Sequence, residues 1–258
     1  MPRFVFLGTS GAIPSAERDT TSLVFAGAGA AVLVDCGGSP VGRLRRAGVD
    51  PLAVSHVVLT HIHPDHAYGL PSLVQNLFLL HRTAPLTIVC RPEHVSPIRA
   101  LLALFNVLER PGIFPIVFAP IALAPGAAAF ATGGLAISTA PNAHGTMPNF
   151  AIRVEAPGAR TVVYSSDTTP CETVAALARG ADTLLHEATF PHRARGRFGA
   201  HSTAREAGEV AARAGVARLI LTHVEADYHG EVDALVEEAR AAFGGPVEMA
   251  RELEPYPM

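Results

Sequence analysis

The feature that most constrains this sequence is an apolar run that ends in a cluster of metal-ligating side chains. The segment Val57–Leu59 has the composition of a buried strand, and Thr-His-Ile-His-Pro-Asp-His follows it at positions 60–66. Three imidazoles and one carboxylate on a tight turn after a strand can converge on one or two cations. We therefore predict a metal site in which His61 and His63 face one ion, and Asp65 and His66 face a second.

Composition limits the class of protein. At 258 residues and 49% hydrophobic content, the chain can bury a large core, as one domain or as two closely packed halves. The formal net charge of −3 argues against a broad nucleic-acid-binding surface. Three scattered cysteines fit neither a disulfide framework nor a cysteine-based zinc site, so we expect a cytoplasmic location. The chain opens with a short apolar run, Arg3–Leu7, typical of a strand, so we expect no export signal. The apolar region 98–131 is interrupted by four prolines, so we expect no membrane span.

Hydrophobic periodicity predicts strands that alternate with helices. Apolar runs predict strands at Arg3–Leu7, Ser22–Ala26, Ala31–Asp35, Val54–Thr60, Leu86–Cys90, Leu135–Ala140, Phe150–Glu155, Thr161–Ser165, Thr183–His186 and Arg218–Thr222. A 3.6-residue spacing predicts helices at Leu70–Leu80, Val95–Phe105, Glu172–Ala178, Ala204–Ala214 and Val232–Phe243. Thr203 and Glu206 have the spacing of a capping box, which supports a helix start there. This order indicates a layered α/β fold with helices outside sheets.

Two apolar strands end in the same tripeptide, Leu-Thr-His, at positions 59–61 and 221–223. Each histidine is followed four residues later by an acid, Asp65 or Asp227. A duplicated half that delivers a strand-end histidine to a central cleft would explain both occurrences. Chance similarity is the alternative.

A site for two cations needs more donors than the first loop supplies. His144, Asp167 and His223 each follow an apolar strand, and together they are predicted to complete the site. Taken singly, each would be an ordinary polar residue at a strand end. Asp35 and Thr60 are better candidates for accepting the second N–H of a metal-bound imidazole than for binding metal.

The chain resembles the metallo-β-lactamase-fold hydrolases through the motif at positions 60–66, followed in order by the three later residues. Within that superfamily it resembles the ribonuclease Z branch of phosphodiesterases, through the motifs Leu7–Gly11, Asp35–Gly37, His186–Phe190 and His201–Ala204. The resemblance implies a four-layer αββα sandwich, formed as one domain over residues 1–258. It also implies the metal ligands: His61, His63 and His144 for one zinc, Asp65, His66 and His223 for the other, with Asp167 bridging the pair.

The expected chemistry follows from two adjacent cations, either zinc or, alternatively, manganese or iron(II). A metal-bridging hydroxide would attack phosphorus in a phosphodiester. The resemblance places His201 near the metals and beside Glu187, where it would protonate the leaving alkoxide. Asp65, His201 and Glu187 are therefore the predicted catalytic residues. Between the last two lie Arg193, Arg195 and Arg197, which could hold a substrate phosphate if their loop covers the cleft, or could form a solvated surface loop.

The spacing of the ligands bears on the substrate. Only 23 positions separate His144 from Asp167, where the resembling tRNA-processing enzymes insert a long arm that grips the tRNA. We therefore predict a small phosphodiester as substrate, doubt a large RNA, and expect no membrane partner. The apolar segment Leu70–Leu80 could support a homodimer. The alternative functions are a tRNA 3′-processing endoribonuclease-like activity, a lactone or thioester hydrolase, and a noncatalytic binding protein that metal stabilises.

Overall fold

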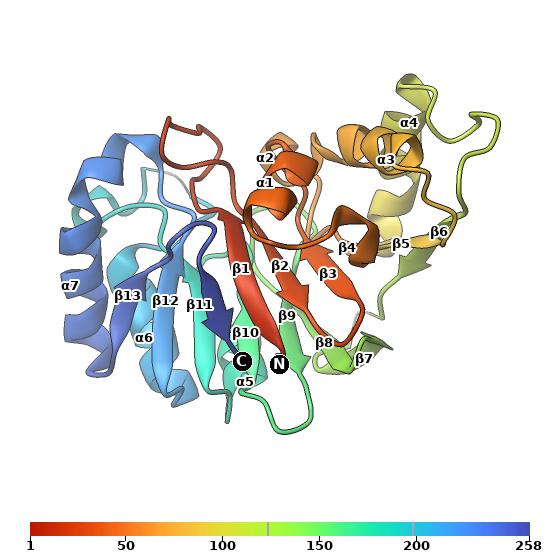
Figure 1. Ribbon diagram of the computed structural model, residues 1–258. Coiled ribbons are helices and arrows are strands. Elements are labelled where there is room, and N and C mark those ends of the chain that lie inside the picture. Colours follow the sequence, from red (N-terminus) through yellow and green to blue (C-terminus); the bar gives the residue numbers. More distant parts are fainter. Residues whose placement is uncertain (123, 198) are drawn as a thin grey trace.

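Two β-sheets lie face to face between outer helices in this computed structural model, which describes residues 1–122, 124–197 and 199–258 (Figure 1). Within the described residues, fourteen strands form two seven-stranded sheets. One hydrophobic cluster contains side chains from both sheets, and two further clusters each join one sheet to its helices. The predicted α/β class and four-layer αββα sandwich are therefore confirmed.

The first sheet is antiparallel at one edge and parallel at the other. Its strands, in spatial order, are β14 (Pro255–Pro257), β1 (Arg3–Gly8), β2 (Ser22–Ala26), β3 (Ala31–Val34), β4 (Val54–Val58), β5 (Leu86–Cys90) and β6 (Ile116–Pro120). The helices and 3-10 turns in this half are α1 (Pro40–Arg46), η1 (Pro51–Ala53), α2 (Pro64–Ala67), α3 (Leu70–Leu79), η2 (Pro92–His94) and α4 (Val95–Leu104).

The second sheet has the same change from antiparallel to parallel pairing. Its strands, in spatial order, are β13 (Val247–Met249), β12 (Arg218–Thr222), β11 (Thr183–Glu187), β10 (Val162–Tyr164), β9 (Phe150–Glu155), β8 (Leu135–Pro141) and β7 (Ala127–Thr132). The helices and 3-10 turns here are α5 (Glu172–Ala178), η3 (His192–Ala194), α6 (Ala204–Ala214), η4 (Ala226–Glu231) and α7 (Val232–Phe243).

The core between the sheets is apolar and aromatic. Phe4 of β1 and Phe150 of β9 are fully buried in it, together with Tyr164 of β10 and Ile220 of β12. The central strands are covered on both faces, and this explains why their sequences are nearly continuous apolar runs. A rigid double layer of this kind holds the loops at the strand ends in fixed relative positions.

Every strand and helix predicted from periodicity is present, with ends within two residues of those expected. The capping box is also confirmed, because Thr203 Oγ1 accepts from Glu206 N at 3.2 Å and Glu206 Oε2 accepts from Thr203 N at 2.9 Å. Several short or peripheral elements were not predicted from the sequence, namely β6, β7, β13, β14, α1 and α2. Strand β14 has the sequence Pro-Tyr-Pro, and proline is tolerated in a strand only at an edge, which is where β14 lies.

The repeated Leu-Thr-His does not mark equivalent strands. In the first sheet the antiparallel series β1-β2-β3 is followed by the parallel strands β4, β5 and β6. In the second sheet β8-β9-β10 is followed in the same way by β11, β12 and β13. Strand β4 therefore corresponds to β11, whereas the second Leu-Thr-His ends β12. The strand order is repeated, but the tripeptide match is not a trace of that repeat.

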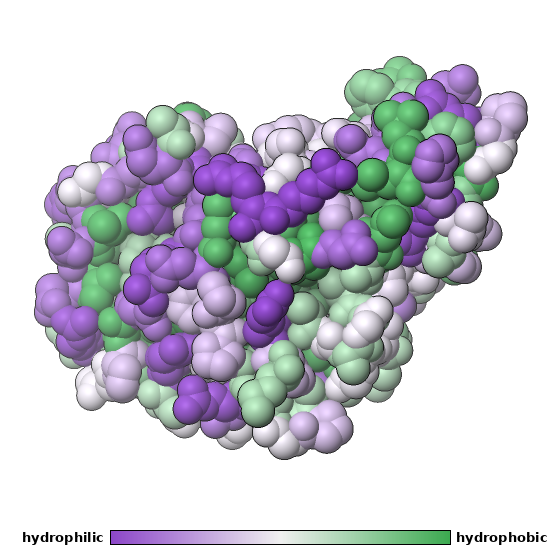
Figure 2. Space-filling view, viewed as in Figure 1, coloured by the Kyte–Doolittle hydropathy of each residue, from purple (hydrophilic) through white to green (hydrophobic). Residues whose placement is uncertain are grey.

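The surface over α3 and α4 is the most hydrophobic part of the face in Figure 2. Leu79, Leu104 and Phe105 are exposed in this region. A homodimer through this face stays a prediction. None of the helices in the described parts of the chain is long and apolar enough to cross a membrane.

Candidate metal centre

All the predicted ligands lie at one end of the two sheets, in loops that follow strands. The loop after β4 carries His61 and His63 and leads into α2, whose first turn contains Asp65 and His66. The other ligands follow strands of the second sheet: His144 after β8, Asp167 after β10 and His223 after β12. The structure brings all seven together in two groups whose donor atoms, within each group, lie within 4.8 Å of one another.

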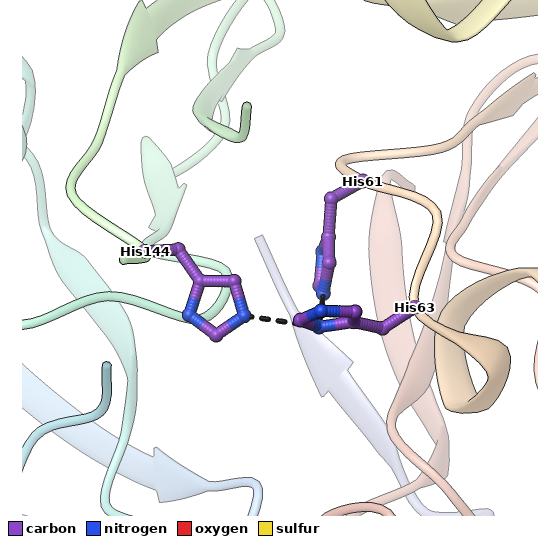
Figure 3. A group of neighbouring side chains, drawn as sticks. All are labelled: His61, His63 and His144. Atoms are coloured by element: carbon purple, nitrogen blue, oxygen red, sulfur yellow. Dashed lines mark hydrogen bonds between the residues drawn. The ribbon is translucent and has the colours of Figure 1, made fainter. Parts of the chain in front are cut away.

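The first group consists of three imidazoles that point toward one another (Figure 3). Nδ1 of His63 lies 3.1 Å from Nε2 of His61 and 3.1 Å from Nε2 of His144. Burial lowers the pKa of all three rings, so they are neutral at pH 7. Three neutral imidazoles that turn ring nitrogens to a common point have the donor set of a divalent transition metal.

The second group consists of two carboxylates and two imidazoles. Nε2 of His66 lies 3.3 Å from Oδ2 of Asp65 and 3.3 Å from Oδ2 of Asp167. Nε2 of His223 lies 3.6 Å and 3.1 Å from the same two oxygens. The four side chains are buried.

Asp167 joins the two groups. Its Oδ2 atom lies 3.8 Å from Nε2 of His61 and 3.9 Å from Nε2 of His144. The same oxygen is in contact with both imidazoles of the second group. One carboxylate thus faces both clusters, which is the position of a ligand shared by two cations.

The electrostatics of the second group favour a cation. Nε2 of His66, Nε2 of His223 and Oδ1 of Asp167 are buried without a hydrogen-bond partner. Burial lowers the pKa of His223, but the carboxylate of Asp167 outweighs burial and raises that pKa to about 10. The pKa of His66 is also raised, because nearby carboxylates outweigh the effect of burial. The carboxylates therefore stabilise positive charge in this group, and a divalent metal bound to Nε2 of the two histidines would take the place of their protons.

The ring nitrogens that face away from the centre of the site have hydrogen-bonding partners of their own. Nδ1 of His66 donates to Oδ2 of Asp35 at 2.9 Å, and Nδ1 of His61 lies 3.2 Å from Oγ1 of Thr60. Thr60 Oγ1 in turn donates to Asp35. The contacts expected for Asp35 and Thr60 are therefore present. They direct Nε2 of each histidine toward the centre of the site.

Three further orienting groups were missed by the sequence analysis. Nδ1 of His144 donates to the carbonyl of Ala200 at 2.9 Å, and Nδ1 of His223 lies 3.1 Å from Oγ1 of Thr189. Ser166 donates from Oγ to Thr60 Oγ1 at 2.8 Å and so connects the two sheets. A carbonyl acceptor leaves no signal in the sequence. The two hydroxyl residues could have been considered, because Ser166 directly precedes Asp167 and Thr189 lies two positions after Glu187.

Three of the six described non-glycine residues with a positive φ lie at the same place. Asp35, Ser166 and His223 have φ values of 57°, 53° and 60°. This left-handed region is uncommon for residues other than glycine and costs on the order of 1 kcal/mol or more at each position. The packing around the site holds these three residues in the conformations that orient the ligands.

Beside the two groups lies the pair formed by His201 and Glu187. Nδ1 of His201 lies 3.0 Å from Oε1 of Glu187. Burial lowers the pKa of His201, but Glu187 outweighs that effect and the net pKa is raised. Burial alone would raise the pKa of Glu187, yet His201 holds it below its usual value. The carboxylate is fully buried and also accepts bonds from Thr168 N, Thr189 Oγ1 and Ser202 N, so it is fixed as an anion.

Comparison with known proteins identifies the fold and the family. A family model described as "Beta-lactamase superfamily domain" matches residues 30–224. The chain belongs to the metallo-β-lactamase superfamily. Two solved structures are similar to this superfamily member over nearly their whole length. The metallo-beta-lactamase fold protein YhfI from Bacillus subtilis has a TM-score of 0.84 at 24% identity, covering 100% of this chain and 99% of that one. Human tRNase Z, short form (ELAC1), has a TM-score of 0.79 at 22% identity, covering 99% and 98%.

Relatives in sequence place the chain more narrowly. The Ribonuclease Z of Halorubrum lacusprofundi is 31% identical over 294 aligned positions, which cover 94% of this chain and 93% of that protein. The chain is therefore a ribonuclease Z-like hydrolase of the metallo-β-lactamase superfamily. Because the alignment is longer than the 258-residue chain, the relative carries residues that this chain lacks.

Proposed function

We propose that this hydrolase is a dinuclear zinc-dependent phosphodiesterase that acts on a small phosphodiester. The observation that carries the proposal is the position of Asp167 Oδ2 between two buried ligand groups, with the His201–Glu187 pair beside it. In this assignment the three imidazoles of the first group hold one ion. Asp65, His66 and His223 hold the other, and Asp167 contacts both.

The bound cations would supply a water-derived nucleophile at neutral pH and would offset the negative charge of a phosphodiester. The protein's own contribution is positional. Asp35 and Thr60 fix the tautomers of His66 and His61, so that each presents Nε2 to the centre. Asp65 provides a carboxylate at the same place, and its hydrogen-bonding neighbours keep its pKa lowered despite burial.

His201 is the proposed proton donor. Its Nδ1 atom is held by Glu187, and its side chain is 20% exposed. Nε2 makes no hydrogen bond with any described residue and is therefore available to a substrate. As the bond from phosphorus to the leaving oxygen breaks, the proton on Nε2 moves to that oxygen, and Glu187 remains ionised and stabilises the imidazolium before transfer.

This pair favours phosphodiesters over carbonyl esters. An alkoxide that leaves phosphorus requires a proton, whereas the thiolate that leaves a thioester does not require a dedicated donor. The test is hydrolysis of bis(4-nitrophenyl) phosphate and of a chromogenic lactone by the same zinc-loaded sample, with a chelated control. Turnover of the lactone alone would replace this proposal with the carbonyl one.

A tRNA 3′-processing activity is the second candidate, and it rests on the relatives named Ribonuclease Z. Two features argue for the smaller substrate. Strands β9 and β10 are joined by a short turn at 156–161, so the segment between His144 and Asp167 forms no protruding arm. The formal net charge is −3, which provides no general attraction for an RNA backbone. Cleavage of a precursor tRNA at its 3′ end, with kcat/KM far above that for small esters, would favour this candidate.

A further inference from the structure

The arginine loop after β11 does not act as one phosphate-binding unit. Each guanidinium is paired with a different carboxylate: Arg193 with Glu231, Arg195 with Glu206, and Arg197 with Asp227. All three guanidiniums are more than half exposed, so these pairs add little to stability. Each pair places its guanidinium beside a different acidic side chain.

Arg195 is the arginine of this loop that shares a cavity with the proposed proton donor. The cavity has a volume of about 360 Å³ and is lined by Thr169, Pro170, Arg195, Gly196, Gly199, His201 and Glu206. A volume of this size accommodates one small ring or one sugar with its substituents. His201 lines this cavity and also belongs to two of the side-chain groups of the metal centre, one with His144 and Asp167 and one with Glu187 and His223.

The hydrogen bonds of Arg195 leave its outer edge free. Nε donates to Oε1 of Glu206 at 2.7 Å, and neither terminal nitrogen bonds to a described residue. Glu206 cannot easily turn toward a ligand, because its other oxygen accepts from Thr203 N at 2.9 Å in the capping box. A guanidinium held through Nε presents two parallel N–H groups, which is the arrangement that binds a phosphate or carboxylate through two hydrogen bonds.

We propose that this cavity, which we call the Arg195 cavity, binds the leaving group of the substrate, and that this leaving group carries a second anionic substituent. The inference rests on the proposed phosphodiesterase function. A proton donor must lie next to the oxygen that departs, so the part of the substrate attached to that oxygen occupies the His201 side of the centre. Arg195 then meets the phosphate or carboxylate borne by that part. The expected substrates are phosphodiesters whose departing alcohol is itself a phosphate ester or an acid.

Two substrates with a common acyclic core separate the charge of the leaving group from its reactivity. Methyl 4-nitrophenyl phosphate releases a leaving group without a second anionic substituent, and methyl 3-carboxy-4-nitrophenyl phosphate releases one that carries a carboxylate. The measured quantity is the ratio of kcat/KM for the second substrate to that for the first. Arg195→Gln should lower this ratio roughly tenfold through KM, because two charge-assisted hydrogen bonds are lost.

Arg193→Gln is the matched control. Arg193 belongs to the same loop, is exposed and pairs with a carboxylate, but it does not line the Arg195 cavity. Substitution of Arg193 should leave the ratio unchanged. Arg195→Lys should give a ratio between those of Arg195→Gln and the wild-type protein, because lysine keeps the positive charge but lacks the two parallel N–H groups of arginine.

The outcomes are distinct. A ratio that falls for Arg195→Gln but not for Arg193→Gln supports the Arg195 cavity as the leaving-group site. Hydrolysis of both substrates with an unchanged ratio in Arg195→Gln overturns the cavity assignment and leaves the phosphodiesterase function standing. Failure of the zinc-loaded wild-type protein to hydrolyse either substrate overturns the function, and the cavity assignment with it.

Discussion

Removal of the proposed proton donor gives the sharpest test of the catalytic residues. His201→Ala deletes an imidazole that contacts Glu187 at 3.0 Å and lies 3.9 Å from Oδ2 of Asp167. General-acid catalysis contributes roughly 10²- to 10⁴-fold, so we expect kcat to fall by that factor for a substrate with an alkoxide leaving group. This corresponds to about 2.7 to 5.4 kcal/mol in the activation barrier.

The assay compares a dialkyl phosphodiester with bis(4-nitrophenyl) phosphate, whose stable phenolate departs without much help from a proton. The loss should therefore be much smaller for the aryl ester, and metal content should match the wild-type protein because His201 is not among the seven ligands. His81→Asn is the control, since His81 is exposed and has a φ of 60° that asparagine tolerates. Equal losses for both esters, or no loss for either, would refute the proton-donor assignment.

Three further predictions concern charge, metal and packing. Glu187→Gln removes the carboxylate that raises the pKa of His201. The protonated donor is lost as pH rises, so the alkaline limb of the pH–rate profile should move to lower pH. An alkaline limb at the wild-type position would argue against this pair. In Asp167→Asn, loss of the shared anionic oxygen should reduce the metal bound per chain, as measured by elemental analysis, and retention of the full wild-type amount would contradict the bridging position. In Gly37→Ala, the new Cβ would lie 2.0 Å from the backbone oxygen of Asp65, so the free energy of unfolding in urea should fall by roughly 1–3 kcal/mol. In Gly230→Ala, the new Cβ would meet no atom within 4 Å, so the free energy of unfolding should change little.

The sequence was informative where chemistry is local or where parallel strands impose a common end. His61 to His66 could be grouped because they lie on one short loop, and the later ligands could be added because each follows an apolar strand. The residues predicted as ligands lie together in the two groups expected for them, and their role as ligands stays a prediction. Their proximity has one physical basis, which is that strands packed in adjacent sheets deliver their terminal loops to the same edge.

The parts that could not be predicted depend on tertiary geometry. Ser166 supports Thr60 across the two sheets from 106 positions away, and nothing in either local sequence indicates that their hydroxyl groups meet. The carbonyl of Ala200 orients His144 through the backbone, which any residue would provide. Edge strands such as β7 bury few side chains, so their hydrophobic pattern is weak.

The arginine loop shows the same limit at the level of function. Sequence alone left open whether Arg193, Arg195 and Arg197 hold a phosphate or form a solvated surface. In the structure each arginine pairs with a different carboxylate. Arg195 differs from the other two because it lines a cavity together with His201. That distinction depends on tertiary contacts between residues far apart in the sequence.

Metal content and activity, measured together on one sample, determine whether the site is a dinuclear catalytic centre. The purified protein is loaded with zinc, freed of excess metal and divided between elemental analysis and hydrolysis of bis(4-nitrophenyl) phosphate, with a chelated portion that is later reloaded. We expect about two zinc ions per chain, loss of hydrolysis on chelation and its return on reloading. A single ion per chain, or hydrolysis that persists after the metal is removed, would contradict it.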